Sequence, residues 1–240
     1  ADEVTLTRQG FNWPNIDFHV PDTVRAYFNE AISRKKNEHG QWRADFEKWR
    51  NGNPDHAKVY DEHWSAGLAP DFWADLIEAA PASGATRKTS QAVLNKAVEM
   101  LPTLVGGSAD LTGSNGSSIP DTAIVGSPNF SGQEFSYSGR MMHYGIREHA
   151  MGSVANGMLL HGGMRPFTAT FLIFSDYMRP SIRLASLSHL PNIFIFTHDS
   201  VFLGEDGPTH QPIEHHWALR MIPNLTYFRP ADGVEVAMSW

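Results

Sequence analysis

Two histidines and two aspartates follow one short apolar run of this 240-residue chain. The run is Ile193–Phe196. His198 and Asp199 come after it, and Asp206 and His210 stand in the glycine-bounded segment beyond. In an open parallel sheet, ligands bind beyond the carboxyl ends of the strands. Side chains that accept hydrogen bonds and move protons are therefore expected to act together at this point.

Zinc binding is a lesser interpretation of the histidines in this region, which are His198, His210, His215 and His216. The sequence lacks the helical pair of histidines at positions i and i+4 that is typical of many zinc sites. The chain also has no cysteine, which excludes disulfides, cysteine-ligated metals and a thiol nucleophile.

Two further segments carry polar groups next to predicted elements. The glycine-rich segment Gly106–Asn115 contains Asp110 and Ser114, and it is either a ligand-binding loop or an ordinary turn. Glu148 begins an apolar helix. Its carboxylate either pairs with the helix dipole or is buried against a cofactor nitrogen, and the spacing alone does not decide between these.

Three aromatic residues, Phe171, Phe174 and Tyr177, recur at helical spacing after another predicted strand. A stripe of this kind is more often part of a core. If it faces the strand ends, it forms a slot for a flat heteroaromatic ring.

Apolar periodicity predicts the elements that position these residues. Helices are expected at Ser90–Leu101, Glu148–Leu160, Asp176–Ser188 and Ile213–Met221 and from Asp232, and strands at Leu104–Val105, Phe167–Phe171, Ile193–Phe196 and Leu225–Phe228. The alternation predicts an α/β fold with a mostly parallel sheet and helices on both faces. The run Ile193–Phe196 suits a strand buried on both faces, and Gly113–Ser138 is expected to be a long surface loop.

The N-terminal part has a different character, with a higher density of charged residues. A helix is predicted from Pro21 or Asp22 to about Arg50, interrupted at Gly40. We expect two parts: a mainly helical connector over residues 1–84, and an α/β domain over residues 85–240 that is truncated at its C-terminus.

Charge and hydropathy exclude several classes of function. The chain has 19 Lys and Arg against 26 Asp and Glu, a formal net charge of −7, which argues against general binding to nucleic acid. No run reaches the ~18 apolar residues of a membrane helix. The sequence shows no secretion signal, so we expect a cytoplasmic protein without a membrane partner. The absence of G-x-G-x-x-G, P-loop and G-x-S-x-G motifs disfavours nucleotide hydrolysis and serine-hydrolase chemistry.

Four segments taken together resemble the transketolase family: GGSADLTGSN, YGIREHAMG, TFLIFSDY and THDSVFLGEDGPTHQPIE. The resemblance runs from about Ala85 to Trp240 in the family's order and approximate spacing. It implies a thiamine diphosphate-dependent transfer of a two-carbon ketol unit between sugar phosphates, with this chain supplying the domain that binds the aminopyrimidine. Residues 1–84 resemble the connector that precedes this domain.

The resemblance also implies roles for single residues. Glu148 would hydrogen-bond the pyrimidine N1′ and so act in catalysis as well as in cofactor binding. The remaining cofactor contacts would be the pyrimidine slot of Phe171, Phe174 and Tyr177, and Asp110 and Leu111 on the thiazolium side.

The implied substrate contacts come from both ends of the domain. His198, Asp206 and His210 would contact the sugar hydroxyls near the reacting carbons. His198 and His210 would both be catalytic, with His210 handling protons and the nascent oxyanion. Arg87 and Ser114 would hold the acceptor's phosphate. Phe202 departs from the family, since many members have a glycine there, and its ring would narrow the substrate channel.

The family's diphosphate and metal site has no counterpart in this sequence. The Mg²⁺ or Ca²⁺ expected with the cofactor would be bound by residues outside the chain, so no metal ligands are assigned within it. We expect a homodimer or a partner chain that carries the diphosphate-binding domain, and an inactive protein without it. The alternatives are a ketol transferase similar to dihydroxyacetone synthase, or a non-catalytic interaction module.

Overall fold

The structure is a computed structural model that describes residues 2–65 and 67–240. The chain divides into two compact units, Ala1–Tyr60 and Asp61–Trp240. Each unit is described by itself.

The first unit is helical, with α1 at Asp2–Gly10, α2 at Asp22–Gly52 and the beginning of α3, Pro54–Trp64. The predicted interruption at Gly40 is wrong, because α2, which is 31 residues long, passes through it without a break. One glycine costs a helix only about 1 kcal/mol relative to alanine, and the long run on either side tolerates this. Aromatic rings stack along α2 from Trp42 to Phe46 to Trp49, with centroids 5.3 and 5.6 Å apart.

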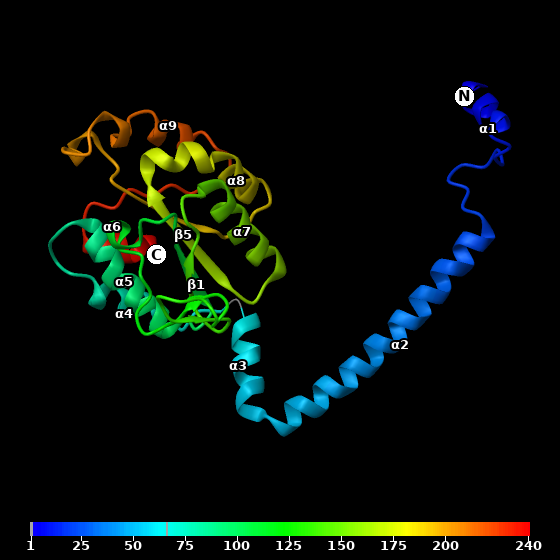
Figure 1. The fold of residues 1–240 in the computed structure, drawn as a ribbon, viewed down its shortest axis with the longest axis horizontal. Coiled ribbons are helices and arrows are strands. Elements are labelled where there is room, and N and C mark those ends of the chain that lie inside the picture. The colour runs from blue at the N-terminus through cyan, green and yellow to red at the C-terminus, as the bar shows by residue number, and fades with distance from the viewer. Residues whose placement is uncertain (1, 66) are drawn as a thin grey trace. The chain divides into compact units, whose positions relative to one another are not determined.

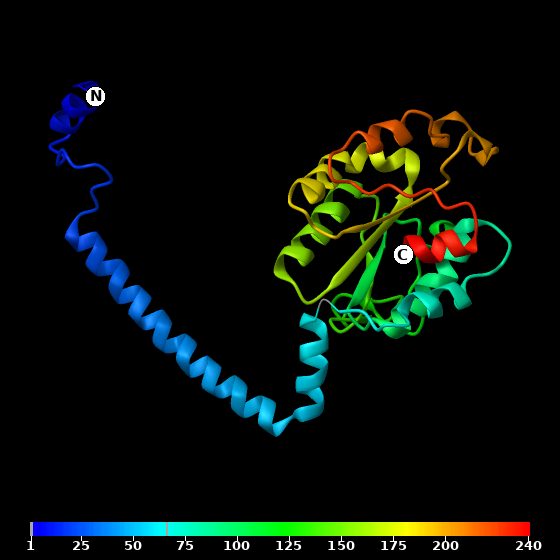
Figure 2. The same ribbon diagram turned by 180° about the vertical axis from the view of Figure 1, so that it is seen from behind.

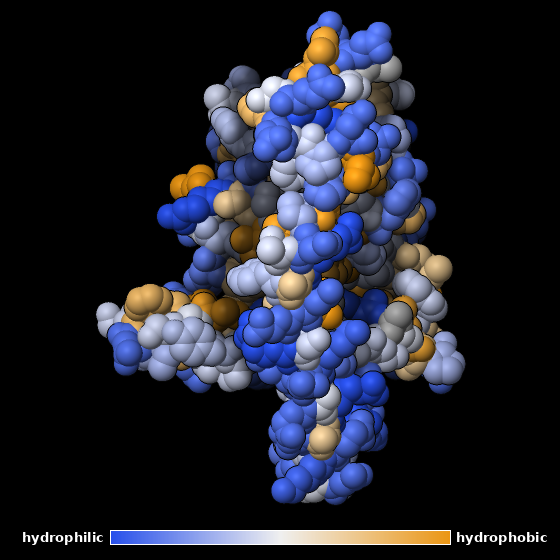
Figure 3. All heavy atoms as spheres, turned by 90° about the vertical axis from the view of Figure 1, so that its right-hand side faces the viewer, coloured by the Kyte–Doolittle hydropathy of each residue, from blue (hydrophilic) through white to orange (hydrophobic). Residues whose placement is uncertain are grey.

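The surface drawn in Figure 3 is mostly hydrophilic, with hydrophobic side chains scattered across it. Over the described residues, no helix combines the length and the apolar character needed to cross a bilayer.

The second unit is built on a sheet of six strands in the order β3-β2-β4-β1-β5-β6 (Figures 1 and 2). Every pairing in it is parallel. The strands are β1 Leu104–Ser108, β2 Ile124–Val125, β3 Phe135–Ser136, β4 Met141–His143, β5 Arg165–Phe171 and β6 Ile193–Thr197. The predicted parallel α/β fold is confirmed.

Helices cover both faces of this sheet, as predicted. They are α4 Phe72–Ala79, α5 Thr86–Met100, α6 Thr112–Asn115, α7 Glu148–His161, α8 Ser175–Leu187, α9 His215–Arg220 and α10 Gly233–Ser239. Side chains of β6 alternate between two cores: Ile193 and Ile195 pack with α4, α5 and α10, whereas Phe194 and Phe196 pack with α7, α8 and α9. This period of two is the pattern of a strand between two helical layers.

Glycines allow the central strands to approach closely. A Cβ at Gly107 in β1 would lie 1.8 Å from the carbonyl oxygen of Met142 in β4, and one at Gly106 would lie 2.2 Å from that of Phe167 in β5. No side chain fits at either place, so the pair of glycines is required by the sheet itself.

Arg140, directly before β4, connects this strand to the end of α5 and to β1. Its guanidinium donates hydrogen bonds to the carbonyls of Val98 and Leu101 at the end of α5 and of Leu104 in β1, at 2.7 to 3.1 Å. Two of these carbonyls belong to the last turn of a helix, where backbone acceptors have no helical partner. Burial lowers the pKa of Arg140 from its usual value.

Several predicted elements differ from those observed. Leu225–Phe228 forms no strand, because Leu225 and Tyr227 pack against the second core without joining the ladder. Consequently β6 is an edge of the described sheet, and residues 193–196 are half-buried rather than buried on both faces. The expected loop Gly113–Ser138 contains most of α6 and all of β2 and β3.

Some helix boundaries also differ from the predicted ones. The helix predicted at Ser90–Leu101 begins at Thr86, four residues earlier, without a side-chain cap. The helix expected near Asp232 is α10, whose cap is Asp232: its Oδ1 accepts from the amide of Glu235 at 2.9 Å.

Candidate functional site

The strands β1, β5 and β6 have their carboxyl ends on the same side of the sheet, and the segments that follow them meet there. Asp110 and Leu111 follow β1, Phe174 ends the 3₁₀ turn that follows β5, and His198 follows β6. Parallel strands place their carboxyl ends together, so residues far apart in sequence become neighbours at this edge.

His198 lies at the centre of this group. Its backbone is left-handed, with φ of 54°, and its ring centroid is 3.8 Å from that of Phe171. Its Nδ1 is 2.8 Å from the hydroxyl of Thr197, which in turn donates to Oδ1 of Asn115 at 2.7 Å. The ring is therefore held on one side by an aromatic contact and on the other by a buried polar chain.

A row of aromatic rings extends outward from His198. The rings of Phe171 and Phe174 stack with centroids 5.9 Å apart, and those of Phe174 and Tyr177 at 6.1 Å. His210 meets Phe174 edge-on at 5.4 Å. The row runs from a buried Phe171 to a Tyr177 that is 65% exposed, so its outer part lies at the surface and not in a core.

A cavity of about 330 Å³ adjoins His198 and carries positive charge. It is lined by Arg87, Lys88, Gln91, Thr112, Gly113, Ser114, Gly116, Ser118 and His198. Gly116 has φ of 60°, and a Cβ there would lie 2.7 Å from the carbonyl oxygen of Arg87. Only glycine lets the end of α6 come this close to α5. Gln91 fixes the position of Ser118 in the cavity wall. Its Nε2 donates to the carbonyl of Ser118, and its Oε1 accepts from the backbone amide of Ser118.

Electrostatics keep His198 neutral. Burial lowers the pKa of its imidazole, and the nearby charge of Arg87 lowers it further, while Asp206 opposes the change. A histidine whose pKa lies below its usual value of 6.5 carries no charge at neutral pH and can accept a hydrogen bond.

Glu148 is the first residue of α7 and is only 7% exposed. Among the described residues, none donates a hydrogen bond to its carboxylate. One turn further along α7, this helix and α8 pack so closely that a Cβ at Gly152 would lie 2.4 Å from Oγ of Ser181. The carboxylate is thus a buried acceptor at the same edge of the sheet as the aromatic row.

Tyr144 stands just before Glu148 and packs against the second core. Burial raises the pKa of its phenol to about 12, so the group stays neutral. Its hydroxyl donates a hydrogen bond to Sδ of Met142 at 3.1 Å.

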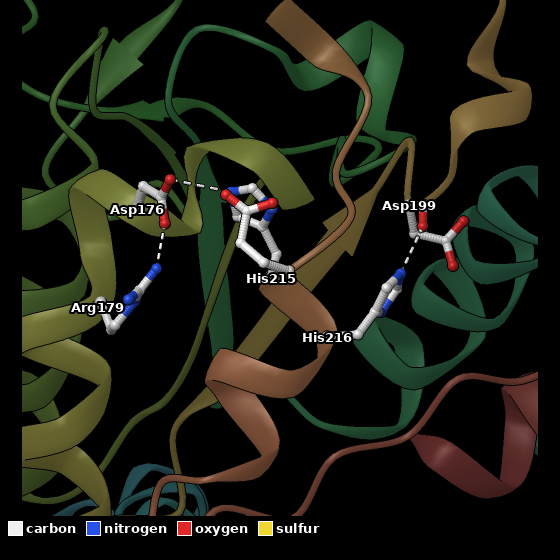
Figure 4. Close-up of polar contacts among 6 residues, drawn as sticks. Asp176, Arg179, Asp199, His215 and His216 are labelled. Atoms are coloured by element: carbon white, nitrogen blue, oxygen red, sulfur yellow. Dashed lines mark hydrogen bonds and ion pairs between the residues drawn. The ribbon is translucent and has the colours of Figure 1, made fainter. Parts of the chain in front are cut away.

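Two consecutive histidines of α9, His215 and His216, bond to residues of other segments (Figure 4). Nε2 of His215 is 3.0 Å from Oδ2 of Asp176 in α8, whose other oxygen pairs with Arg179. Nε2 of His216 donates to the carbonyl of Asp199 at 2.8 Å. These bonds anchor α9 to α8 and to the residue that follows His198.

The carboxylate of Asp199 and the second ring nitrogen of His216 also have partners. Oδ2 of Asp199 accepts from Nε of Arg229 at 2.7 Å, and Nδ1 of His216 is 2.7 Å from the hydroxyl of Tyr227. Burial is the first cause that raises the pKa of Tyr227. From the sequence, His216 is a candidate only for zinc binding, and no local pattern signals this anchoring role.

The described residues contain one group able to offer three ligand atoms to a metal, namely Asp176, Glu214 and His215, with those atoms within 4.8 Å of one another. Asp176 is already paired with Arg179 and His215, which leaves it a poor ligand. Of the four histidines weighed for zinc, His215 alone belongs to this described group.

The structure brings some predicted residues together and leaves others at the rim. Arg87, Ser114 and His198 line one cavity, and His210 contacts the aromatic row. Asp206 is exposed but acts electrostatically on His198. Asp110 is exposed and left-handed, with φ of 64°, beside a half-buried Leu111. The ring of Phe202 is 92% exposed in the turn Val201–Leu203.

Together these features define an α/β domain with a candidate ligand site at the carboxyl ends of its parallel strands, made of a row of aromatic rings, a buried carboxylate and a basic cavity. Comparison with known proteins gives the family. Residues 82–240 match the family described as transketolase, pyrimidine-binding domain. The chain belongs to the transketolase family, and a domain that binds a pyrimidine implies thiamine diphosphate as the cofactor.

Individual relatives agree with this. The transketolase of Mycobacterium leprae is 48% identical over all of this chain, and that of Aquifex aeolicus is 42% identical over 99% of it. The chain spans 35% and 33% of their lengths. Among solved structures, the Pichia stipitis transketolase in complex with sedoheptulose-7-phosphate is 36% identical with a TM-score of 0.86, covering 98% of this chain and 35% of that one.

Proposed function

We propose that this chain supplies the pyrimidine-binding half of a thiamine diphosphate-dependent transketolase, which moves a two-carbon ketol unit from a ketose phosphate to an aldose phosphate. The observation that carries the proposal is the aromatic row that begins at His198, at the same sheet edge as the unpaired, buried carboxylate of Glu148. When bound, the cofactor supplies the nucleophilic carbon that carries the two-carbon unit.

The residues present fit a flat, basic ring. Phe171, Phe174 and Tyr177 offer stacked faces for it. Glu148 offers a buried acceptor without a described donor, which suits a ring nitrogen that must hold a proton. Asp110 and Leu111, which follow β1, would line the thiazolium side.

The basic cavity fits a phosphorylated sugar. Arg87 and Ser114 line it and would hold the phosphate, since a guanidinium matches phosphate geometry. His198, Asp206 and His210 would contact the sugar hydroxyls, and His210 would move protons and stabilise the developing oxyanion. A relative from Pichia stipitis with a bound sugar phosphate supports this class of substrate.

The proposal includes a partner. Residues outside this chain would bind the diphosphate with Mg²⁺ or Ca²⁺, provided by a second copy of the longer protein or by a separate chain. The helical part over residues 1–84 would connect the two domains, ahead of the domain at 85–240. The cytoplasmic location expected from the sequence is part of the same proposal.

Glu148→Gln tests the assignment in the enzyme assembled with a diphosphate-binding partner. The change keeps the shape of the side chain and removes its charge. We expect exchange of the cofactor's C2 proton to be abolished while calorimetry still detects cofactor binding. The matched control is His149→Gln, which changes the exposed neighbouring residue and should leave the exchange rate unaltered.

Other outcomes lead elsewhere. Normal proton exchange in Glu148→Gln would remove Glu148 from its role. A failure of the assembled pair to bind cofactor would favour the interaction module. Faster turnover with formaldehyde than with an aldose phosphate would favour the enzyme similar to dihydroxyacetone synthase.

A further inference from the structure

His198 has a backbone conformation that its surroundings must hold. It lies in the left-handed region, with φ of 54°. Residues with a Cβ seldom adopt this region, and they keep it only where the contacts around the turn impose it. Because the ring of His198 lines the basic cavity, whatever holds this turn also decides where the ring lies.

Asp199, the next residue, is bonded through both its backbone and its side chain. Its carbonyl oxygen accepts from Nε2 of His216 in α9 at 2.8 Å (Figure 4). Its Oδ2 accepts from Nε of Arg229 at 2.7 Å, but both side chains of this ion pair are about half exposed, and water weakens such a pair. The bond from His216 acts on the backbone itself, within one residue of His198.

Tyr227 prepares His216 for this bond. A carbonyl oxygen only accepts hydrogen bonds, so Nε2 of His216 must carry a hydrogen. In a neutral ring, Nδ1 is then the acceptor, and it lies 2.7 Å from the hydroxyl of Tyr227. Burial raises the pKa of Tyr227, so this hydroxyl keeps the hydrogen that it donates.

We infer that His216 and Tyr227 are positioning residues: through the carbonyl of Asp199 they fix the turn at His198, and with it the place of the His198 ring in the basic cavity. The described lining of the cavity includes His198 but neither His216 nor Tyr227. They therefore act on the site through Asp199 and not by contact with a ligand.

Both positioning residues are attached to the second core. Tyr227 packs against that core, and the guanidinium of Arg220 lies over its ring, 5.5 Å from the centroid. His216 belongs to α9, whose Leu219 is fully buried in the same core. Donors whose own side chains are held by packing fix an atom more firmly than donors on a free loop do.

A competing interpretation is that these bonds only fasten α9 to the end of β6. The two interpretations differ in what they predict for the ring of His198. This ring lies against Phe171, with centroids 3.8 Å apart. If the turn is held by His216 and Tyr227, loss of either must change the surroundings of the ring; if it is not, the ring stays as it is.

The tautomer of His216 is the first test. Long-range ¹H–¹⁵N correlation spectra of the full chain with ¹⁵N-labelled histidine, recorded above pH 6.5, show which nitrogen carries the hydrogen. His216→Gln assigns the signal. We expect the hydrogen on Nε2. A wild-type His216 with its hydrogen on Nδ1 has nothing to donate to Asp199 from Nε2, and this result would overturn the inference without any variant.

The pKa of His198, followed through its ring-proton signals, is the second test. Burial lowers this pKa in the wild type, and Arg87 and His210 lower it further, while Asp206 and Asp199 oppose the change. In Tyr227→Phe and in His216→Leu we expect the pKa to rise toward 6.5, because the released ring becomes more exposed. The ring-proton signals should also lose the shift that Phe171 causes.

Matched variants separate positioning from general damage. His216→Gln should keep the wild-type pKa of His198, because its amide can donate at the place of the imidazole Nε2. His56→Leu in α3 and Tyr137→Phe make the same changes at exposed residues and should have no effect. Tyr227→Phe removes a single oxygen atom and keeps the ring, so it decides even if His216→Leu fails to fold. An unchanged pKa with unchanged ring-proton signals in Tyr227→Phe would overturn the inference.

The effect on the reaction rests on the proposed function. In the assembled enzyme, Tyr227→Phe should lower kcat/KM about tenfold, the effect of about 1.4 kcal/mol, while the cofactor Kd from calorimetry changes by less than about twofold. The pKa and the tautomer are measured without cofactor or substrate, so they stand if the proposed activity fails. A shifted pKa of His198 with unchanged kcat/KM would refute the role in the reaction.

Discussion

Arg140 is expected to be among the most sensitive positions for stability, although it lies outside the candidate site. Its guanidinium reaches three carbonyls, those of Val98, Leu101 and Leu104. A hydrogen bond to a charged donor is worth ~1.5 kcal/mol at the lower end of the usual range. Loss of all three in Arg140→Met should therefore lower the free energy of unfolding by about 3 to 5 kcal/mol.

The assay is urea-induced unfolding, combined with hydrogen exchange of the backbone amides of β1 and α5, which reports opening of this unit. Arg140→Lys keeps a charge without the fork and should lose about half as much. Arg183→Met is the control, because Arg183 is exposed on α8 and bonds to no described residue. A loss in Arg140→Met within about 0.5 kcal/mol of the control would refute the reasoning.

Three further predictions follow from the geometry. Gly107→Ala should destabilise the chain by more than about 3 kcal/mol in urea unfolding, because its Cβ would overlap the carbonyl of Met142, whereas Gly157→Ala, with open space at its Cβ, should stabilise α7 by up to about 1 kcal/mol; equal effects would contradict the packing argument. Arg87→Ala should weaken binding of phosphorylated acceptors in the assembled enzyme far more than of unphosphorylated ones in calorimetry, and equal losses would move the phosphate elsewhere. The pKa of His198 is lowered on folding, so the stability that depends on its neutral form is complete above pH 6.5 and is lost as the pH falls through the folded pKa. The urea midpoint of His198→Gln should accordingly fall less between neutral and acid pH than that of the wild type, and identical pH profiles would argue against the shift.

Some of the fold follows from local pattern. The helix at Glu148 and the strand Ile193–Phe196 were predicted within one or two residues of α7 and β6, because their apolar spacing reflects two packed faces. The strand expected at Leu225–Phe228 does not form, although its apolar pattern is real. Apolar side chains there do face a core, but the backbone finds no neighbouring strand with which to pair.

The candidate site divides in a similar way. Residue types and order were sufficient to single out Glu148, the aromatic stripe and the histidines after β6, and to suggest the family. They left open whether the stripe was core or slot, and the structure adds that Phe171 is buried whereas Tyr177 is exposed.

The sequence by itself determined most of the alternation of elements and the family, and it singled out the candidate site residues, because these are properties of local pattern and motif. The tertiary structure decided which distant groups bond to one another. Asn115 meets Thr197 because α6 contacts β6, and His216 of α9 bonds to the carbonyl of Asp199. Such contacts arise from packing between segments far apart in the chain, so no local pattern encodes them.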